Sequence, residues 1–193
     1  MAFTFEESTH TYRLDGNILP SVSKILEPLS GAEYANIPSS ILMTAANRGT
    51  EIHRAIEDFI IFGERGIPEE YRGYFDAFEA WYSTAKPKII ATELQMYHPI
   101  LLYAGTSDLV CQIGDDICLV DYKSSSKVID KVYRVQMEAY KQLLKCRNIN
   151  ITRKILLHLK GAGYYEEVYY QTDDTEAWRV FGALRTVYAY KNS

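Results

Sequence analysis

Apolar side chains change their spacing along this chain. From Pro38 onward they recur every three or four positions, and residues 69–84 repeat that spacing with aromatic side chains. From Lys88 to Tyr97, and again on both sides of Gly114-Asp115, apolar and β-branched residues dominate, which favours strands. We therefore expect two amphipathic helices, then a strand and a β-hairpin.

Shorter patterns flank this central part. They predict, in order, strands at 3–5, 11–14 and 17–19, a short helix from Ser21, a helix over 130–145, strands over 153–159 and 164–170, and a last helix from about Thr172 that docks through Trp178, Phe181, Leu184 and Val187. Both faces of the central hairpin are mostly apolar, so each needs a covering layer of helices. The predicted fold class is α/β, with a central mixed β-sheet flanked by helices.

Two carboxylates occupy the far ends of the predicted hairpin. A two-residue turn sets Asp108 directly across from Asp121, and opposed side chains share one face with Cβ atoms about 4.5–5.5 Å apart. Like charges this close repel, and a divalent cation with oxygen ligands suits the gap. Lys123 projects to the face of Asp121, whereas Tyr122 points away and leaves its carbonyl near the same edge. An acid at each end of a hairpin is also typical of strands that emerge into solvent.

Length and composition favour one globular domain. The chain has 193 residues, of which 47% are hydrophobic and 24% charged. We expect a single domain over 1–193, with an N-terminal hairpin and short helix over 1–40, a catalytic core over 41–170 and a C-terminal helix over 171–193. No apolar run reaches membrane-spanning length, and the N-terminus lacks a secretory pattern, so we expect a cytoplasmic protein with no membrane association.

Cysteine and charge usage narrow the class further. The three cysteines include no Cys-x-x-Cys pair, which excludes a zinc ribbon or a four-cysteine cluster within one chain. The net charge of −4 provides no overall basic field for nucleic acid. Any contact with DNA must come from a local patch, and the candidates are Lys123, Lys127, Lys131 and Arg134. The same four residues also fit the solvated start of a helix.

Five short motifs follow one another in order. They are Gly49-Thr-Glu-Ile-His53, Glu93, Gly105-Thr-Ser-Asp108, Asp121-Tyr-Lys123 and Gln136-Met-Glu-Ala-Tyr140. Together they resemble the PD-(D/E)XK nuclease superfamily, specifically its RecB-like and phage exonuclease branch. The resemblance spans residues 45 to 145 and implies a restriction-endonuclease-like core. No phosphate-loop motif is present in the sequence, so the helicase part of the larger RecB proteins has no counterpart here.

The resemblance implies a metal site. Asp108 and Asp121 would bind Mg²⁺ or Mn²⁺, with the Tyr122 carbonyl as a further ligand and His53 as the extra ligand of this branch. Glu93 resembles an acid that some members place near a second metal. Taken alone, His53 could equally be an ordinary helix histidine paired with Glu57.

The remaining motif residues imply catalytic and positioning roles. Lys123 would orient or help deprotonate the attacking water and offset the charge that builds on the phosphate. Gln136 and Tyr140 match the helix motif that lines the site and meets the DNA backbone. From the residues alone, Lys123 could instead pair with Asp121, and Gln136 with Tyr140, as structural contacts.

The resemblance therefore implies a metal-dependent DNA nuclease, in the first instance an exonuclease of phage-type recombination or DNA processing. DNA is the expected partner, and the pattern leaves room for a homo-oligomer and for a single-strand-binding or recombination partner. One alternative is a nucleic-acid-binding or interaction module with the nuclease fold but no turnover. Another is a metal-dependent hydrolase of a smaller phosphate ester.

Overall fold

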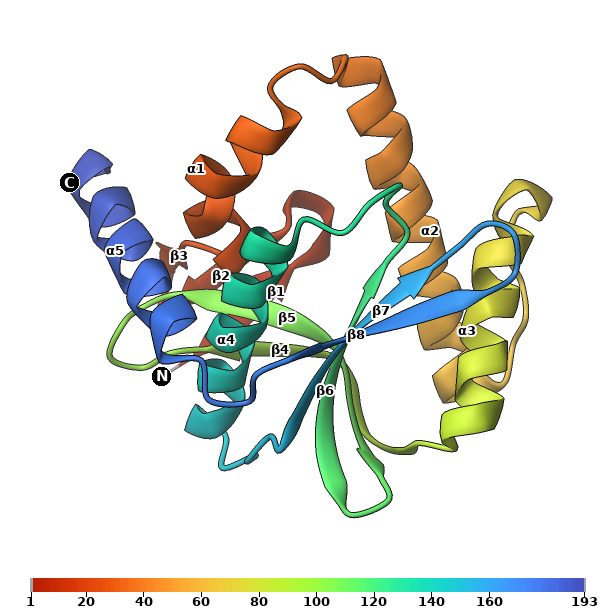
Figure 1. Ribbon diagram of the computed structural model, residues 1–193. Helices are drawn as coiled ribbons and strands as arrows, with labels where there is room; N and C mark the ends of the chain where they lie inside the picture. The colour runs from red at the N-terminus through yellow and green to blue at the C-terminus, as the bar shows by residue number, and fades with distance from the viewer. Residues whose placement is uncertain (1, 193) are drawn as a thin grey trace.

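The centre of the molecule is a five-stranded mixed sheet (Figure 1). The computed structural model describes residues 2–192. In spatial order the strands are β4 (Lys88–Tyr97), β5 (Ala104–Ile113), β6 (Asp116–Lys123), β7 (Arg153–Leu159) and β8 (Tyr165–Tyr170). Neighbouring strands are antiparallel except β6 and β7, and this parallel pair is joined by a crossover through α4 (Asp130–Cys146). The predicted α/β class with a mixed central sheet is confirmed.

Helices cover both faces of this sheet (Figure 1). One face packs against α1 (Val22–Tyr34), α4 and α5 (Thr175–Lys191), and the other packs against α2 (Ser39–Phe62) and α3 (Arg72–Ala85). The α1 helix begins where predicted because the Ser21 side chain accepts a hydrogen bond from the backbone of Lys24. The α5 helix begins slightly later than predicted, because Asp174 caps it.

A small antiparallel sheet precedes the main one in the chain. Its strands are β1 (Phe3–Glu6), β2 (Thr11–Leu14) and β3 (Asn17–Leu19), as the sequence predicts, and single 3₁₀ turns occur at Glu7–Thr9 and Glu69–Tyr71. The turn between β2 and β3 places Asp15 and Gly16 at φ of 49° and 83°, where glycine and aspartate are tolerated. Tyr12 and Leu19 pack this sheet against Ala104 at the start of β5.

The predicted hairpin register is confirmed. Leu109 pairs with Val120, Cys111 pairs with Cys118, and the turn falls at Gly114-Asp115. Side chains alternate between the two layers: Val110 and Leu119 join the core under α1, α4 and α5, whereas Leu109 and Val120 join the core under α2 and α3. Because the hairpin register is fixed, the face of the sheet on which Asp108 and Asp121 lie is fixed as well.

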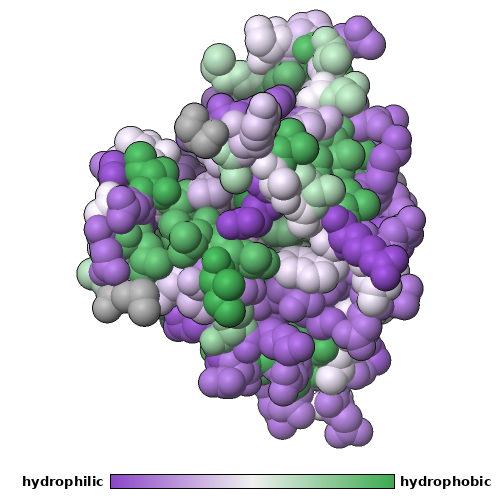
Figure 2. All heavy atoms as spheres, turned by 90° about the vertical axis from the view of Figure 1, so that its left-hand side faces the viewer, coloured by the Kyte–Doolittle hydropathy of each residue, from purple (hydrophilic) through white to green (hydrophobic). Residues whose placement is uncertain are grey.

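The face on the α5 side of the molecule is chemically mixed (Figure 2). Apolar side chains gather in its middle. Large apolar residues that are exposed in this protein include Ile18 on β3, Ile100 and Leu102 in the β4–β5 loop, and Val187 on α5. The prediction that Val187 docks α5 is wrong, because Phe181 and its neighbours fill that core and leave Val187 45% exposed. Among the described helices, none combines the length and apolar character that crossing a membrane requires.

Candidate active site

Three acids lie in a row across β4, β5 and β6. The strand pairing on either side of Glu93 sets it opposite Asp108, and the hairpin register continues to set Asp108 opposite Asp121. Asp108 and Asp121 are buried, with 8% and 1% of their surface exposed. The backbone N–H of Tyr122 donates a 2.7 Å hydrogen bond to Oδ2 of Asp108, which holds that carboxylate against β6. We call Glu93, Asp108 and Asp121 the acid cluster.

Glu93 has an unusual backbone conformation. Its φ of 44° lies in the left-handed region although the residue is inside a strand and is not glycine. Such a residue costs on the order of 1–3 kcal/mol and persists only where its surroundings enforce it. Here the side chain of Glu93 reaches Nδ1 of His53 at 3.5 Å. The strain therefore coincides with the acid cluster.

His53 brings an imidazole from α2 to two of these acids. Its Nδ1 lies 3.5 Å from Oε1 of Glu93 and 3.6 Å from Oδ1 of Asp108, so it pairs with these acids rather than with Glu57. One ligand atom from each of His53, Glu93 and Asp108 lies within 4.8 Å of the other two. Two carboxylates and an imidazole at this spacing are a donor set for a divalent cation.

Asp121 lies outside that three-ligand set. Nζ of Lys123 contacts its Oδ2, and Nε2 of Gln136 donates to its Oδ1 at 3.4 Å. The reason is the β-strand period, since residues 121 and 123 share one face of β6 and the ammonium neutralises the nearer carboxylate. The structure thus groups His53, Glu93 and Asp108 as potential ligands and holds Asp121 beside them as the partner of Lys123. The role of Asp121 as a metal ligand stays a prediction.

Tyr122 points to the opposite face of β6, as predicted. Its ring is buried against His53 and Phe78, with ring centroids 5.5 Å apart in both contacts. Its N–H serves Asp108, as described above. The part assigned to its carbonyl as a metal ligand stays a prediction.

Burial and charge together perturb the acid cluster. Burial raises the pKa of Asp108, and it raises the pKa of Asp121 to about 6 although Lys123 opposes the shift. Burial would lower the pKa of His53, but the carboxylates of Asp108 and Glu93 outweigh it and raise that pKa to about 9. Burial also opposes the charge on Lys123, yet Asp121 and Asp108 raise its pKa. The site therefore carries a field that favours cations.

The α4 helix forms one wall of the site. Nε2 of Gln136 lies 3.3 Å from the hydroxyl of Tyr140 as well as 3.4 Å from Asp121, so both predicted residues face the acid cluster. Gly105 allows this approach, because a Cβ built there would lie 2.6 Å from Cε1 of Tyr140. The glycine of the Gly-x-x-Asp motif is thus explained by helix–strand contact.

Two contacts near the site have no signal in the sequence. The hydroxyl of Tyr12 lies 2.7 Å from Oγ1 of Thr106, which ties the small sheet to β5 two residues before Asp108. Arg48 lies one turn before His53, and its guanidinium donates to the carbonyl of Ser124 at 2.9 Å. Both pairs are distant in sequence, and the short motif that ends at His53 begins after Arg48, so neither was predicted.

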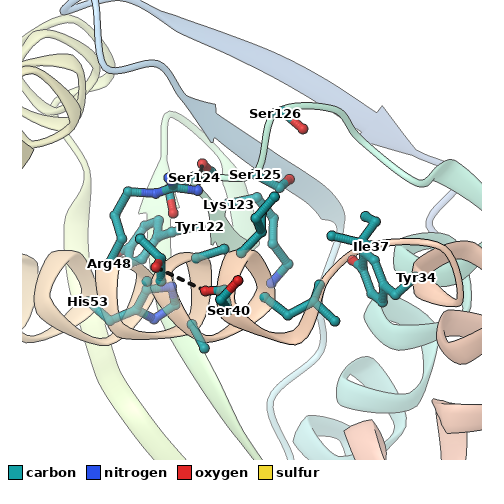
Figure 3. A pocket seen from close by; sticks show the side chains of 16 residues that line it. Tyr34, Ile37, Ser40, Arg48, His53, Tyr122, Lys123, Ser124, Ser125 and Ser126 are labelled. Carbon is teal, nitrogen blue, oxygen red and sulfur yellow. Dashed lines mark hydrogen bonds between the residues drawn. The ribbon is translucent and has the colours of Figure 1, made fainter.

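A cavity of about 650 Å³ adjoins the site (Figure 3). Its walls are the N-terminal half of α2, the end of α1 with the link that follows, and the segment Ser124–Ser126 after β6. His53, Tyr122 and Lys123 belong to its lining. The cavity is therefore continuous with the acid cluster through His53 and Lys123.

The predicted basic patch is not available as a set of free charges. Lys123 contacts Asp121, Lys131 lies 3.2 Å from Glu33, and Arg134 binds Asp174 and Glu176. Lys127 forms no ion pair within the described residues. Acids of α1 and of the start of α5 thus neutralise Lys131 and Arg134, and a contact between this group of residues and DNA stays a prediction.

No family model and no curated protein sequence matches the chain. Among solved structures, the chain is similar to SSO0001, with a TM-score of 0.50, 13% identity, and coverage of 91% of this chain and 78% of that one. A protein from Eubacterium rectale named as a candidate exonuclease gives a TM-score of 0.46 at 10% identity, with coverage of 74% and 64%.

A third structure, LHK-Exo in complex with dAMP, gives a TM-score of 0.42 at 10% identity, with coverage of 90% of this chain and 87% of that one. At these identities, the likeness to SSO0001 concerns the fold, so the chemistry has to be argued from the site itself.

Proposed function

We propose that this protein is a metal-dependent nuclease that hydrolyses phosphodiester bonds in DNA. The observation that carries the proposal is the spacing of His53, Glu93 and Asp108, whose ligand atoms lie within 4.8 Å of one another beside the Asp121–Lys123 pair. A strained Glu93 and carboxyl groups with raised pKa are costly for folding, and such costs concentrate at functional sites.

The residues present fit a hard divalent cation. The acid cluster has three carboxylates but only one lysine in contact with it among the described residues. The negative field that raises the pKa of His53 would also attract a metal ion. His53, Glu93 and Asp108 would hold Mg²⁺ or Mn²⁺, with the imidazole making Mn²⁺ the stronger candidate activator. When bound, such an ion neutralises phosphate charge and lowers the pKa of water, effects of several kcal/mol in metal sites.

The chain's own residues would divide the remaining work. Lys123 stays protonated, since neighbouring acids raise its pKa, and it would offset charge on the phosphate rather than accept a proton. Asp121, with a pKa of about 6, is the better acceptor for the proton of the attacking water. Gln136 and Tyr140 on α4 would orient the carboxylate of Asp121 and the DNA strand that binds beside it.

More specifically, we propose that the protein is an exonuclease of phage-type recombination or DNA processing and that it belongs to the RecB-like branch. Purified protein is incubated with end-labelled linear DNA and with covalently closed circular DNA, with Mg²⁺, Mn²⁺ or EDTA. We expect loss of linear DNA with metal and no loss in EDTA or with Lys123→Ala. Cutting of circles would make the protein an endonuclease, and hydrolysis confined to small phosphate esters would favour the smaller-substrate alternative.

Metal binding gives a second readout that does not need turnover. A ligand that binds the folded state stabilises it by about 2.7 kcal/mol at a hundred times its dissociation constant. We expect Mn²⁺ to raise the melting temperature of the wild type and to leave that of Glu93→Gln nearly unchanged. If the protein binds DNA but hydrolyses none with any metal, the result would instead support the alternative of a nucleic-acid-binding module that has the nuclease fold but no activity.

A further inference from the structure

The cavity beside the acid cluster is mainly apolar on the side away from it. Ile37, Ile41, Leu42 and Ala45 line it, together with the ring of Tyr34, whereas Arg48, Lys123 and the serines 124–126 form its polar part (Figure 3). An anionic group and a flat apolar group could therefore bind side by side. A nucleotide combines these two chemistries, with its phosphate toward the polar part and its base toward the apolar part.

Within residues 2–192, the apolar side chains in the N-terminal half of α2 do not join any of the three hydrophobic cores. Further along this helix, Ile52 and Ile56 are fully buried against the sheet. In contrast, Ile41 is 58% exposed and Leu42 and Ala45 are half-buried, and all three line the cavity. Exposed apolar surface inside a concave site is typical of a place where a ligand is bound.

The volume suits a single nucleotide better than a duplex. Pockets for small ligands commonly measure about 300–1,000 Å³, and this cavity of about 650 Å³ lies within that range. The ring of Tyr34 belongs to the lining, and this residue is half-buried, so part of its surface is open to the cavity. The lining thus offers aromatic as well as aliphatic surface.

The charges around the site do not favour a grip on duplex phosphates. Duplex binding depends on free lysines and arginines that neutralise phosphates. Here Lys123, Lys131 and Arg134 are each paired with acids of the chain itself, which leaves Lys127 as the one member of the predicted patch without an ion pair within the described residues. Unpaired bases are instead bound by stacking and apolar contact, which is largely independent of phosphate charge.

We propose that this cavity receives an unpaired nucleobase next to the phosphate that is cleaved, so that the substrate is a single strand or a frayed end of DNA. The inference rests on the proposed function for the identity of the neighbouring phosphate. It adds a binding site for the base, formed by the N-terminal half of α2 and Tyr34, to the metal and catalytic groups already described.

Abasic substitution tests the proposal. Single-stranded oligonucleotides, each with one abasic nucleotide moved stepwise from the labelled end, are bound to the protein in Ca²⁺ and cleaved in Mn²⁺. Stacking of one base is worth about 5- to 150-fold in affinity, so we expect one abasic position to weaken binding by that factor. Equal binding of every abasic strand, or tighter binding of a blunt duplex than of a single strand, would overturn the inference.

Two variants of α2 localise the effect. Ala45→Trp fills the cavity more than two turns away from His53, and Asn47→Trp introduces the same side chain at an exposed position outside the cavity. We expect Ala45→Trp to lose at least tenfold in single-strand affinity and to become indifferent to the abasic position, with Asn47→Trp unchanged. If Ala45→Trp does not fold, Ile41→Asp changes a 58% exposed lining residue without touching the core and should weaken binding likewise.

The outcomes separate the two proposals. Metal-dependent hydrolysis with no abasic effect would remove the base site and leave the nuclease intact. An abasic effect on binding with no hydrolysis in any metal would keep the base site and contradict the nuclease. Wild-type affinity and discrimination in both Ala45→Trp and Ile41→Asp would show that the base binds elsewhere, which also overturns the inference.

Discussion

Two groups of buried charge lie on different faces of α4, and they are built differently. On the face away from the site, Glu138 accepts from Nζ of Lys154 at 2.7 Å and from Nε2 of Gln142 at 2.8 Å. Lys141 contacts Asp173 and donates to the carbonyl of Thr172 at 2.8 Å. We call Glu138, Lys141, Lys154 and their partners the anchor cluster. Each of its ammonium groups faces a carboxylate.

The acid cluster lacks that balance. Three carboxylates face the single ammonium of Lys123 and the imidazole of His53, and burial raises the pKa of Asp108 and Asp121. Lys154 is fully buried because Glu138 satisfies it, whereas Asp108 is buried with more negative charge around it than the chain compensates. Paired buried charge serves the fold, and surplus buried charge of one sign is available to a cation.

The largest expected effect breaks the acid cluster. Asp108→Asn keeps an oxygen for the Tyr122 N–H but removes one ligand charge. A metal contributes several kcal/mol to catalysis, and each 1.36 kcal/mol is tenfold in rate, so we expect a loss of roughly 10³-fold in cleavage of linear DNA. In EDTA the variant should be at least as stable as the wild type by urea denaturation. A clear loss of stability would show that Asp108 is a structural charge.

The opposite result is expected in the anchor cluster. Lys154→Met removes the nearer cation of buried Glu138 and leaves Lys141, whose Nζ is 3.8 Å from Oε1; loss of the closer partner costs about 3–5 kcal/mol in comparable buried pairs. The free energy of unfolding should fall by that amount and recover in the double variant Lys154→Met/Glu138→Gln. Residual cleavage per folded molecule should stay close to wild type. If the single variant is fully stable, the anchor cluster is not the balanced pair described above.

The sequence predicted local pairing better than distant pairing. The register that opposes Leu109 to Val120 followed from Gly114-Asp115 alone, because a two-residue turn permits one alignment. The positive φ of Glu93 and its contact with His53 had no local signal, since they depend on how α2 packs against β4. The placement of Asp121 with Lys123, outside the three-ligand set, likewise depends on side-chain geometry that residue spacing leaves open.

A smaller effect is expected where Tyr140 of α4 packs against Gly105 of β5. In Gly105→Ala the new Cβ would lie 2.6 Å from Cε1 of Tyr140 and 3.2 Å from Cγ2 of Val22, so α4 or the tyrosine must shift. Overpacking of this kind typically costs 1–3 kcal/mol, and the shift should also lower cleavage because Gln136 moves with Tyr140. Gly182→Ala on α5 is the matched control, with open space at its Cβ and an expected gain below about 1 kcal/mol. Calorimetry measures the stability of the two variants, and release of the end label measures their cleavage rates. An unaltered cleavage rate in Gly105→Ala would show that the packing of α4 against β5 does not affect the active site.

The smallest expected effect concerns a charge that the sequence assigned to DNA. Lys131 is 76% exposed and lies 3.2 Å from Glu33, so the pair resembles surface ion pairs worth about 0–1 kcal/mol. If α1 and α4 hold this lysine away from phosphates, Lys131→Ala should leave the salt dependence of single-strand binding unchanged. Loss of a lysine that contacts a phosphate would instead reduce the slope of log affinity against log salt by about 0.7.

Lys127→Ala is the matched comparison, because Lys127 also follows β6 and has no ion pair within the described residues. A full change of slope in Lys131→Ala would mean that the Glu33 pair opens on binding, and that acids of the chain and phosphates compete for the same cation.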